Sequence, residues 1–309
     1  METSEITVSK GGWFSRPVIF KKDLTGQVIV ITGSNQGIGK ETARSLAKTG
    51  ATIILACRDP KKALNAVEEL KADTKNSNIE FMKLDLSDLK SIKDFTNEFK
   101  NKYHNLNILI NNAAVFVSQR TVTKDGFEAH WGTNHLGLFY LTTLLLDVIK
   151  SSGPSRIINV SSAMVHLAKM NWDDLNYENE KEYSMFKAYG QSKLAGIMFT
   201  KELQRRLDSE GAQVKVVAAD PGGVNTNIHN NENPRWYEKI IAKGIQTFGA
   251  SPADGAKTNL YCALEDFEKL QGGGFYVDSK IGKVTSAAEL EENWAKVWSV
   301  SETMLKSKI

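Results

Sequence analysis

The sequence predicts a doubly wound α/β fold, in which one parallel β-sheet carries helices on both faces. Short apolar, β-branched runs alternate with longer helical patterns along the chain, as in a parallel sheet with right-handed crossovers. The runs are apolar at nearly every position, which is typical of strands buried on both faces. No internal repeat, low-complexity tract or change of composition divides the 309 residues, so one domain is expected.

The predicted elements follow one another at regular spacing. The first strand covers residues 27–32 and leads through a glycine-rich turn into a helix over 40–48, which ends before Gly50. Further strands are predicted at 52–56, 79–84, 107–110, 156–160, 214–218 and 274–277. Further helices are predicted at 61–72, 89–102, 136–149 and 189–207.

The turn after the first strand has the composition of a phosphate-binding loop. Residues 33–39 have the sequence GSNQGIG and precede a helix. Glycines allow a tight turn and a close backbone approach, and the free N–H groups at a helix start attract a phosphate. The spacing G-x-x-x-G-x-G differs from the usual G-x-G-x-x-G, so an ordinary strand–helix turn with structural glycines is the alternative.

A second pattern places Tyr189 and Lys193 four residues apart on one predicted helix. This spacing puts both side chains on one face, about one turn apart. A protonated Lys193 is expected to stabilise the phenolate and to lower the Tyr189 pKa from about 10 toward neutrality, which makes the phenol a usable proton donor or acceptor. Because such pairs recur by chance, the catalytic interpretation of Tyr189 and Lys193 also depends on the glycine turn and on the pair Ser161–Ser162, which ends the strand at 156–160.

Five motifs in this order resemble the short-chain dehydrogenase/reductase family over residues 24–275. They are the turn at 32–39, Asn111-Asn112-Ala113-Ala114, Asn134, Ser162 with Tyr189-x-x-x-Lys193, and Pro221-Gly222-x-x-x-Thr226. The sequences ACRD at 56–59, NVSS at 159–162 and SKLA at 192–195 are most similar to the retinol-dehydrogenase-like branch. The resemblance implies a single-domain Rossmann-like fold and an oxidoreductase that interconverts an alcohol and a carbonyl with a nicotinamide cofactor.

The resemblance also implies a role for each catalytic candidate. Tyr189 exchanges the proton with the substrate oxygen, Lys193 lowers the pKa of the phenol and binds the nicotinamide ribose, and Ser162 holds the substrate oxygen. Asn134 supports a water-linked proton path; a buried amide at a helix kink is the alternative. Adjacent strand residues point to opposite faces, so only one of Ser161 and Ser162 faces the cleft, and the family pattern selects Ser162.

Cofactor contacts are expected at the glycine turn, after the second, third and fourth strands, at the Tyr–Lys pair and at the Pro-Gly loop. The cofactor-binding candidates are Gly33, Ser34, Asn35, Gln36, Gly37, Ile38, Gly39, Arg58, Asp85, Leu86, Asn112, Ala113, Ala114, Tyr189, Lys193, Pro221, Gly222, Val224 and Thr226. Asp85 is equally well explained as a helix-start residue.

The end of the second strand bears on the choice between NAD(H) and NADP(H). In dinucleotide-binding folds an acid there selects NAD, whereas a nearby arginine accommodates the extra phosphate of NADP. Cys57 stands in place of the acid, and Arg58 offers a planar fork to a phosphate. Asp59, followed by Pro60, is explained as the N-cap of the next helix. NADP(H) is therefore expected over NAD(H), with a surface-only role for Arg58 as the alternative.

Composition excludes several other classes. A net charge of +3 gives no basic patch for nucleic acid. Cys57 and Cys262 form no disulfide framework, and the histidines share no ligand spacing, so no metal site is predicted. No apolar run reaches about 18 residues, so no transmembrane span is expected. A cytoplasmic, reducing location is predicted, with peripheral contact to an intracellular membrane left open.

The domain is expected to cover residues 23–285, between an N-terminal extension over 1–22 and a tail helix over 286–309. Within it, residues 225–249 resemble a lid over the substrate. Its apolar residues recur at helical spacing and are Trp236, Tyr237, Ile240, Ile241, Ile245 and Phe248. Such a lid favours long or bulky apolar carbonyls, such as retinal or a lipid aldehyde, over small polar ones. The same face would equally pack on the core, a partner subunit or a membrane surface.

Two further expectations concern function class and assembly. The rival function is a non-catalytic nucleotide-binding interaction or sensor protein of the same fold, which has no need of the Tyr189–Lys193 pair. Since family members commonly pair through their long helices, a homodimer is expected to form through residues 136–149 and 189–207.

Overall fold

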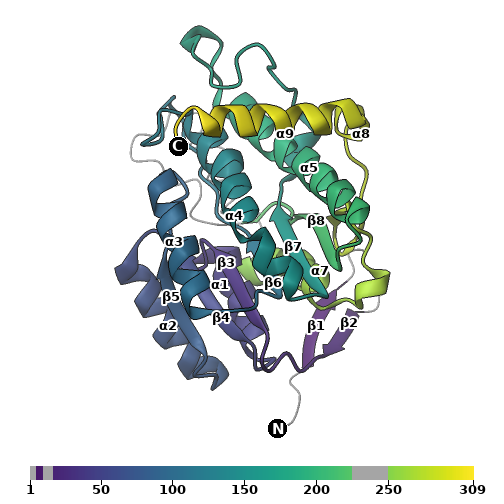
Figure 1. The fold of residues 1–309 in the computed structure, drawn as a ribbon. Coiled ribbons are helices and arrows are strands. Elements are labelled where there is room, and N and C mark those ends of the chain that lie inside the picture. Colours follow the sequence, from purple (N-terminus) through teal and green to yellow (C-terminus); the bar gives the residue numbers. More distant parts are fainter. Residues whose placement is uncertain (1–4, 10–16, 225–249) are drawn as a thin grey trace.

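The central sheet has eight strands in the order β10-β9-β8-β7-β6-β3-β4-β5 in the computed structural model, which describes residues 5–9, 17–224 and 250–309 (Figure 1). All neighbours pair in parallel except the edge pair β9–β10. The strands are β3 (Val28–Thr32), β4 (Thr52–Cys57), β5 (Ile79–Lys83), β6 (Ile108–Asn111), β7 (Ser155–Val160), β8 (Val214–Asp220), β9 (Phe275–Val277) and β10 (Lys280–Ile281). The predicted doubly wound parallel sheet is confirmed; the short β10 was not predicted.

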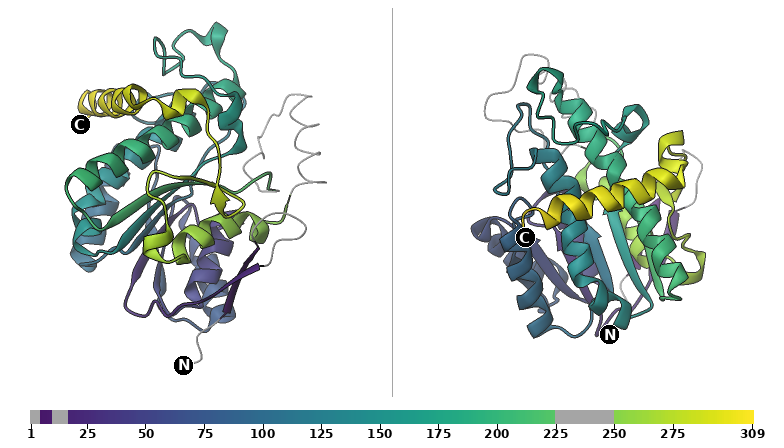
Figure 2. Two further views of the ribbon diagram at one scale, coloured as in Figure 1. Left: turned by 90° about the vertical axis from the view of Figure 1, so that its right-hand side faces the viewer. Right: turned by 45° about the horizontal axis from the view of Figure 1, so that its top comes forward.

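Helices cover both faces of this sheet (Figures 1 and 2). One face carries α1 (Gly37–Ala47), α2 (Pro60–Thr74) and α7 (Pro252–Leu264). The other carries α3 (Leu89–Lys102), α4 (Leu138–Ser151) and α5 (Met185–Ser209). Shorter segments are the π-helical η1 (Trp131–Gly137) and the 3-10 helices η2 (Ala163–Leu167), η3 (Glu180–Glu182) and η5 (Phe267–Lys269). Among the described residues, no helix combines the length and apolarity needed to cross a membrane.

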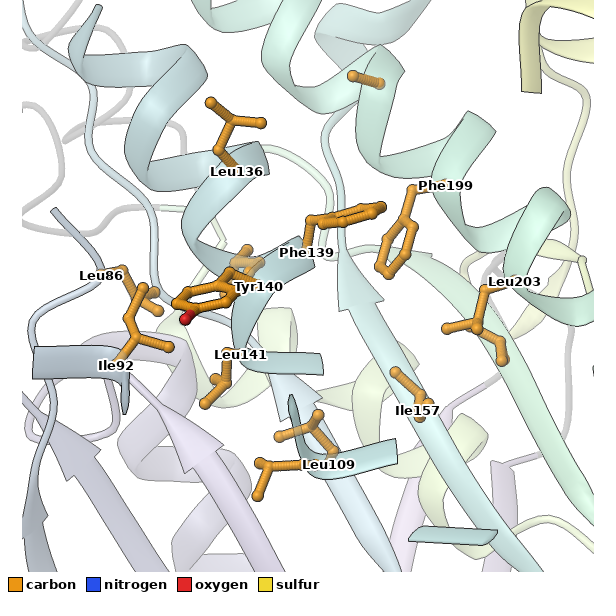
Figure 3. Packing of buried hydrophobic residues seen from close by; sticks show 14 of the residues in the cluster. Leu86, Ile92, Leu109, Leu136, Phe139, Tyr140, Leu141, Ile157, Phe199 and Leu203 are labelled. Atoms are coloured by element: carbon orange, nitrogen blue, oxygen red, sulfur yellow. The ribbon is translucent and has the colours of Figure 1, made fainter. Parts of the chain in front are cut away.

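The position of β3 between two helical layers explains why residues 28–31 are all apolar. Val28 and Val30 pack into the cluster beneath α3, α4 and α5, whereas Ile29 and Ile31 pack into the cluster beneath α1, α2 and α7. Figure 3 shows the first cluster, in which Phe139 of α4 lies beside Phe199 of α5, with ring centroids 5.0 Å apart. A strand between two helical layers must be apolar on both sides.

A two-stranded antiparallel hairpin of β1 (Glu5–Ser9) and β2 (Pro17–Lys21) lies outside the main sheet. Ile6, Val8 and Phe20 are buried in the cluster shared with α7, and the Phe20 ring packs edge-on against Tyr261 at 6.2 Å. The sequence predicted only an extension here, because EITVS and PVIFK lack the nearly continuous apolar run that marks strands such as β3.

The tail forms α8 (Ser286–Glu289) and α9 (Glu291–Lys306), and α9 crosses over α5 and α4 (yellow in Figure 1). Trp298 is buried against Phe139 of α4, with ring centroids 5.0 Å apart, and the Arg206 guanidinium of α5 lies 4.0 Å from the Trp298 ring centroid. Ser301 Oγ lies 2.7 Å from His135 Nε2. The tail helix therefore covers part of the surface of α4 and α5.

Candidate functional site

A cavity of about 350 Å³ opens at the carboxyl ends of β3, β4, β5 and β6. Strand order reverses between β3 and β6, which is where open α/β sheets bind ligands. The described residues that line it are Gly33, Asn35, Gln36, Gly37, Ile38, Gly39, Ala56, Cys57, Arg58, Asp59, Lys62, Leu84, Asp85, Leu86, Asn112, Ala113, Ala114, Val115 and Thr133. The predicted cofactor-binding candidates from the glycine turn to Ala114 thus meet in one cavity, except Ser34.

The glycine turn has no room for side chains at two of its glycines. A Cβ on Gly33, whose φ is +64°, would lie 2.9 Å from Cα of Ala113, and a Cβ on Gly39 would lie 2.5 Å from Asn112 Nδ2. Helix α1 begins at Gly37, three residues before the predicted start, and its N-cap Gln36 makes no side-chain capping bond. The N–H groups of the first helical turn are therefore available to an anion in the cavity.

The floor of the cavity is tied to the end of β3. Thr32 Oγ1 accepts the N–H groups of Asn112 at 3.0 Å and Ala113 at 2.9 Å, and Asn112 Nδ2 donates to the Thr32 carbonyl at 2.8 Å. Ser34 is fully buried beneath the turn, where its hydroxyl donates to the Ile31 carbonyl at 2.7 Å. Thr32 was not predicted as a site residue; its place as the last residue of the first strand was the available signal.

Two cations stand at the rim of the cavity, beyond the end of β4. Arg58 is exposed, and Lys62 lies in the first turn of α2. Asp59 caps α2 as predicted: its carboxylate accepts the Lys62 N–H at 3.1 Å, Pro60 follows at the first helical position, and the Lys62 N–H lowers the Asp59 pKa. Sequence reasoning missed Lys62, although a second cation four residues after Arg58 was a visible signal.

Asp85 lines the cavity and does not cap a helix. Its carboxylate accepts the backbone N–H of Ser87 at 3.0 Å and the Ser87 hydroxyl at 2.6 Å. The N-cap of α3 is Asp88, which accepts the Ser91 N–H at 3.1 Å. The alternative explanation of Asp85 as a helix-start residue therefore applies to Asp88 instead.

The four catalytic candidates meet at the carboxyl ends of β6 and β7. Tyr189 and Lys193 are buried on α5, and the Ser162 hydroxyl, just after β7, lies close enough to the Tyr189 phenol to lower its pKa. Lys193 Nζ donates to the Val160 carbonyl at 2.8 Å and lies 5.8 Å from the centroid of the Tyr189 ring. The hydroxyl of the other serine, Ser161, is buried and has no partner among the described residues.

The prediction that the Tyr189 pKa is lowered is wrong: the protein groups that surround the phenol raise it. Burial raises the pKa of Tyr189 to about 12, the hydrogen bond from Ser162 offsets part of the rise, and the Asp220 charge adds to it. Burial also lowers the pKa of Lys193 to about 8, against the opposing effect of Asp220. The Lys193 ammonium is held by the Val160 carbonyl, so desolvation outweighs any benefit to the phenolate.

Asn134 lies in the middle of the π-helical segment η1. Its amide holds the backbone of Val115 on both sides, accepting the N–H at 2.7 Å and donating to the carbonyl at 3.0 Å. Asn134, Ser161 and Lys193 also line a second cavity of about 20 Å³, which has room for one water molecule. The Asn134 amide is thus buried in a distorted helix and also lines a polar cavity.

The Pro-Gly loop follows β8. Gly222 has φ +76°, and Val224 forms a parallel bridge with Ala250. Thr226 and the predicted lid at 225–249 lie outside the described residues. The buried Asp220, at the end of β8, lies close enough to shift the pKa values of both Tyr189 and Lys193.

A buried carboxylate–histidine pair lies behind Tyr189. Glu128 and His130 are both fully buried, with 2.7 Å between Glu128 Oε1 and His130 Nδ1. The other ring nitrogen, Nε2, accepts the Val117 N–H at 3.0 Å, and the His130 and Tyr189 ring centroids are 6.0 Å apart. Every polar atom of the imidazole therefore has a partner, as expected of a structural histidine.

The other histidines predicted to be ordinary structural or surface residues lie apart from one another. His135 is buried beside Ser301, and burial lowers its pKa to about 3. His166 is exposed on η2, and His229 lies outside the described residues. Within the described ranges, no group of three or more His, Cys, Asp or Glu side chains has the geometry of a metal site.

The sequence matches the protein-family model described as short chain dehydrogenase over residues 27–174 and 176–236. The chain belongs to the short-chain dehydrogenase family. It is 44% identical to retinol dehydrogenase 12 of Mus musculus over 283 residues, which cover 91% of this chain and 87% of the relative. It is 38% identical to the polyprenol dehydrogenase of Homo sapiens, with 94% of this chain and 88% of the relative covered.

Solved structures agree with this family fold. A crystal structure of an uncharacterised protein from Mycobacterium paratuberculosis is 34% identical and superposes with a TM-score of 0.72, covering 92% of this chain and 95% of that one. Salutaridine reductase from Papaver somniferum is 22% identical, with a TM-score of 0.62 over 81% of this chain and 99% of that one. This short-chain dehydrogenase is thus an oxidoreductase related to retinol and polyprenol dehydrogenases, and its family implies a nicotinamide cofactor.

Proposed function

We propose that this chain is an NADP(H)-dependent oxidoreductase that interconverts an apolar alcohol and its carbonyl. One observation carries the proposal: the buried Tyr189 phenol lies near the Ser162 hydroxyl and beside the buried Lys193. A protein that only bound a nucleotide would gain nothing from burying a phenol beside an ammonium, because burying polar groups costs free energy.

The residues of the large cavity fit a dinucleotide. The glycine turn, closed to side chains, and the open N–H groups of α1 suit a pyrophosphate. Asp85 and Leu86 would flank the adenine, residues 112–114 would form the floor, and Arg58 with Lys62 would hold the 2′-phosphate. Lys193 would bind the nicotinamide ribose, and the loop at 221–224 the carboxamide. Bound there, the nicotinamide supplies or accepts the hydride.

In this proposal Tyr189 transfers the proton. During carbonyl reduction its phenol donates a proton to the substrate oxygen, and during alcohol oxidation its phenolate accepts one. Ser162 fixes the phenol and gives the same oxygen a second hydrogen-bonding group. With a pKa of about 12, the phenol carries its proton at neutral pH, which favours the reductive direction.

The small cavity gives this site a route for resupplying the proton. A water molecule in the space between Asn134, Ser161 and Lys193 would have an ammonium donor on one side and a free serine hydroxyl on the other. Since the Lys193 pKa is about 8, the ammonium is mostly protonated at neutral pH and is able to replace the proton that the phenol loses.

The substrate is proposed to be a medium-to-long apolar aldehyde or ketone. Phe116, Met185 and Tyr189 form an apolar cluster, on which Met164 and Phe186 pack, and the relatives include retinol and polyprenol dehydrogenases. With NADPH, retinal and a long-chain aldehyde should give a higher kcat/KM than a short polar aldehyde. Equal or better efficiency with the short polar aldehyde would contradict the substrate class, and NADPH binding without turnover on a broad panel would support the non-catalytic rival.

NADP(H) preference is proposed to depend on Arg58. The change Arg58→Ala should weaken NADPH binding by about 10–100-fold, because it removes a charge-assisted contact to the 2′-phosphate, and should leave NADH binding nearly unchanged. Titration calorimetry with both cofactors measures this. The exposed Lys61→Ala, which alters a neighbouring cation outside the cavity, is the control. Equal losses for NADPH and NADH, or no loss, would show that Arg58 does not select the cofactor.

The homodimer and the cytoplasmic location with peripheral membrane contact stay predictions of the sequence. Because α9 lies across α5, a dimer formed through α4 and α5 would include α9 in its contact surface.

A further inference from the structure

Asp220 is a buried acid for which the reaction proposed above has no use. It is the last residue of β8 and is 3% exposed. Carboxylates are seldom buried to this extent without compensating partners, because desolvation penalises their charged form. The groups that surround the Asp220 carboxylate therefore indicate the role of its charge.

The carboxylate joins the two loops that flank the candidate site. Its Oδ1 accepts the backbone N–H of Gly222 at 2.9 Å, in the loop after β8, and the backbone N–H of Ala163, in the segment after β7, lies close enough to lower the pKa of the carboxyl. Ala163 follows Ser162 directly, and β7 and β8 are neighbouring strands. A single buried side chain thus faces both the segment that follows Ser162 and the Pro-Gly loop.

The charged and titratable groups around Asp220 come from three elements. Tyr189 and Lys193 face it from α5, His166 from η2, and Asp278 from the segment after β9. Lys193 is the buried cation of this group, whereas His166 and Asp278 are exposed. Water screens the exposed charges, so the strongest coupling is expected between Asp220 and the buried pair.

We propose that Asp220 is a positioning residue for the reaction: its buried carboxylate ties Ala163 to Gly222, so that Ser162 stays opposite Tyr189, and its charge acts on the Tyr189–Lys193 pair. The proposal rests on the proposed function, because the reaction it serves is the proton transfer by Tyr189. Asp220 does not touch the reacting atoms in this scheme; it acts through Ser162, Tyr189 and Lys193.

The charge has a defined effect on pH dependence. A nearby carboxylate favours the protonated form of a phenol and of an amine, and Asp220 raises the pKa of both Tyr189 and Lys193. Loss of its charge must therefore lower both pKa values. Carbonyl reduction requires a protonated Tyr189, so the pH above which kcat/KM for reduction falls moves to a lower value. Alcohol oxidation requires the phenolate, so the pH below which kcat/KM for oxidation falls also moves to a lower value.

The test compares Asp220→Asn with the wild type. Asparagine keeps the shape of the side chain and one acceptor oxygen but removes the charge. The limbs of kcat/KM are expected to shift down by about one pH unit in both directions of the reaction. A variant that merely loosens the loops would lose rate at every pH without moving a limb. Unmoved limbs in Asp220→Asn would therefore overturn the electrostatic role.

A second readout does not depend on turnover. In the chain labelled with isotopic lysine, NMR follows the titration of Lys193, whose signal is assigned by its absence from Lys193→Arg. The wild-type pKa of about 8 should fall in Asp220→Asn and stay near its wild-type value in Asp220→Glu, which keeps the charge. The same Lys193 titration in wild type and Asp220→Asn would overturn the proposal even if the chain reduced no carbonyl.

Asp278→Asn is the matched control. It removes an exposed carboxylate that also faces the Asp220 side chain, and it should leave the pH limbs and the Lys193 titration in place. A shift in this control as large as in Asp220→Asn would mean that the site responds to any nearby negative charge, and the special role of Asp220 would be refuted. Absence of carbonyl reduction in the wild type, with an intact Lys193 shift, would count only against the proposed function.

Discussion

Tyr189→Phe is expected to lower kcat for carbonyl reduction by about 10²–10⁴-fold, the usual contribution of a positioned general acid, and to leave NADPH affinity unchanged. Phenylalanine keeps the ring that packs edge-on against Phe116 at 4.8 Å and removes only the hydroxyl that lies near Ser162. Steady-state kinetics with retinal and NADPH, together with fluorescence titration of NADPH, separates the loss of chemistry from a loss of binding.

Tyr140→Phe provides the comparison for this variant. Tyr140 is a buried tyrosine of α4 that packs in the core beside Leu86 and Ile92 (Figure 3) and is not itself among the residues that line either cavity. It should retain wild-type kcat. Turnover in Tyr189→Phe at the wild-type rate would eliminate the proton-transfer role of the phenol.

Trp298→Ala is expected to lower the free energy of unfolding by about 3–5 kcal/mol, the usual cost of removing a buried tryptophan. The side chain is 7% exposed and lies between Phe139 of α4, with ring centroids 5.0 Å apart, and Phe199 of α5, at 5.9 Å. Its loss leaves a cavity beneath α9 and removes the cation–π contact with Arg206. Urea denaturation followed by circular dichroism measures the change.

Ser299→Ala tests whether the loss belongs to the buried face of α9. Ser299 is exposed on the same helix, one residue from Trp298, so its replacement should change the free energy of unfolding by less than about 0.5 kcal/mol. If both variants unfolded at the wild-type urea concentration, α9 would contribute little to the stability of the domain.

The parallel core could be predicted from the sequence because its signal is local. The runs VIVIT and TIILAC can satisfy both of their apolar faces only inside a sheet covered on both sides, and they form β3 and β4. The pair β1–β2 has no such signal. Its strands, EITVS and PVIFK, are not continuously apolar, and Ile6 and Phe20 are buried in a cluster to which α7, more than 200 residues further along, contributes.

At the site, spacing predicted proximity but not electrostatics. The four-residue separation of Tyr189 and Lys193 placed both on one face of α5, as expected. The direction of the phenol pKa could not be obtained in this way, because it depends on how completely other elements bury the pair and on Val160, whose carbonyl holds the ammonium. The surroundings of Asp220 could not be predicted for the same reason, since the backbone N–H groups of Gly222 and Ala163 come from different loops.

The position of α9 has a consequence for the order in which the molecule assembles and opens. Its contacts join residues far apart in the chain: Trp131 Nε1 donates to Met304 Sδ at 3.3 Å across 173 positions, and His135 meets Ser301 across 166. Closing such long loops costs entropy before any contact repays it, so α9 docks onto helices that have already formed. We expect the reverse step to release α9 alone, a partial opening that exposes Phe139 and Phe199 to solvent while every strand of the parallel sheet keeps its neighbours.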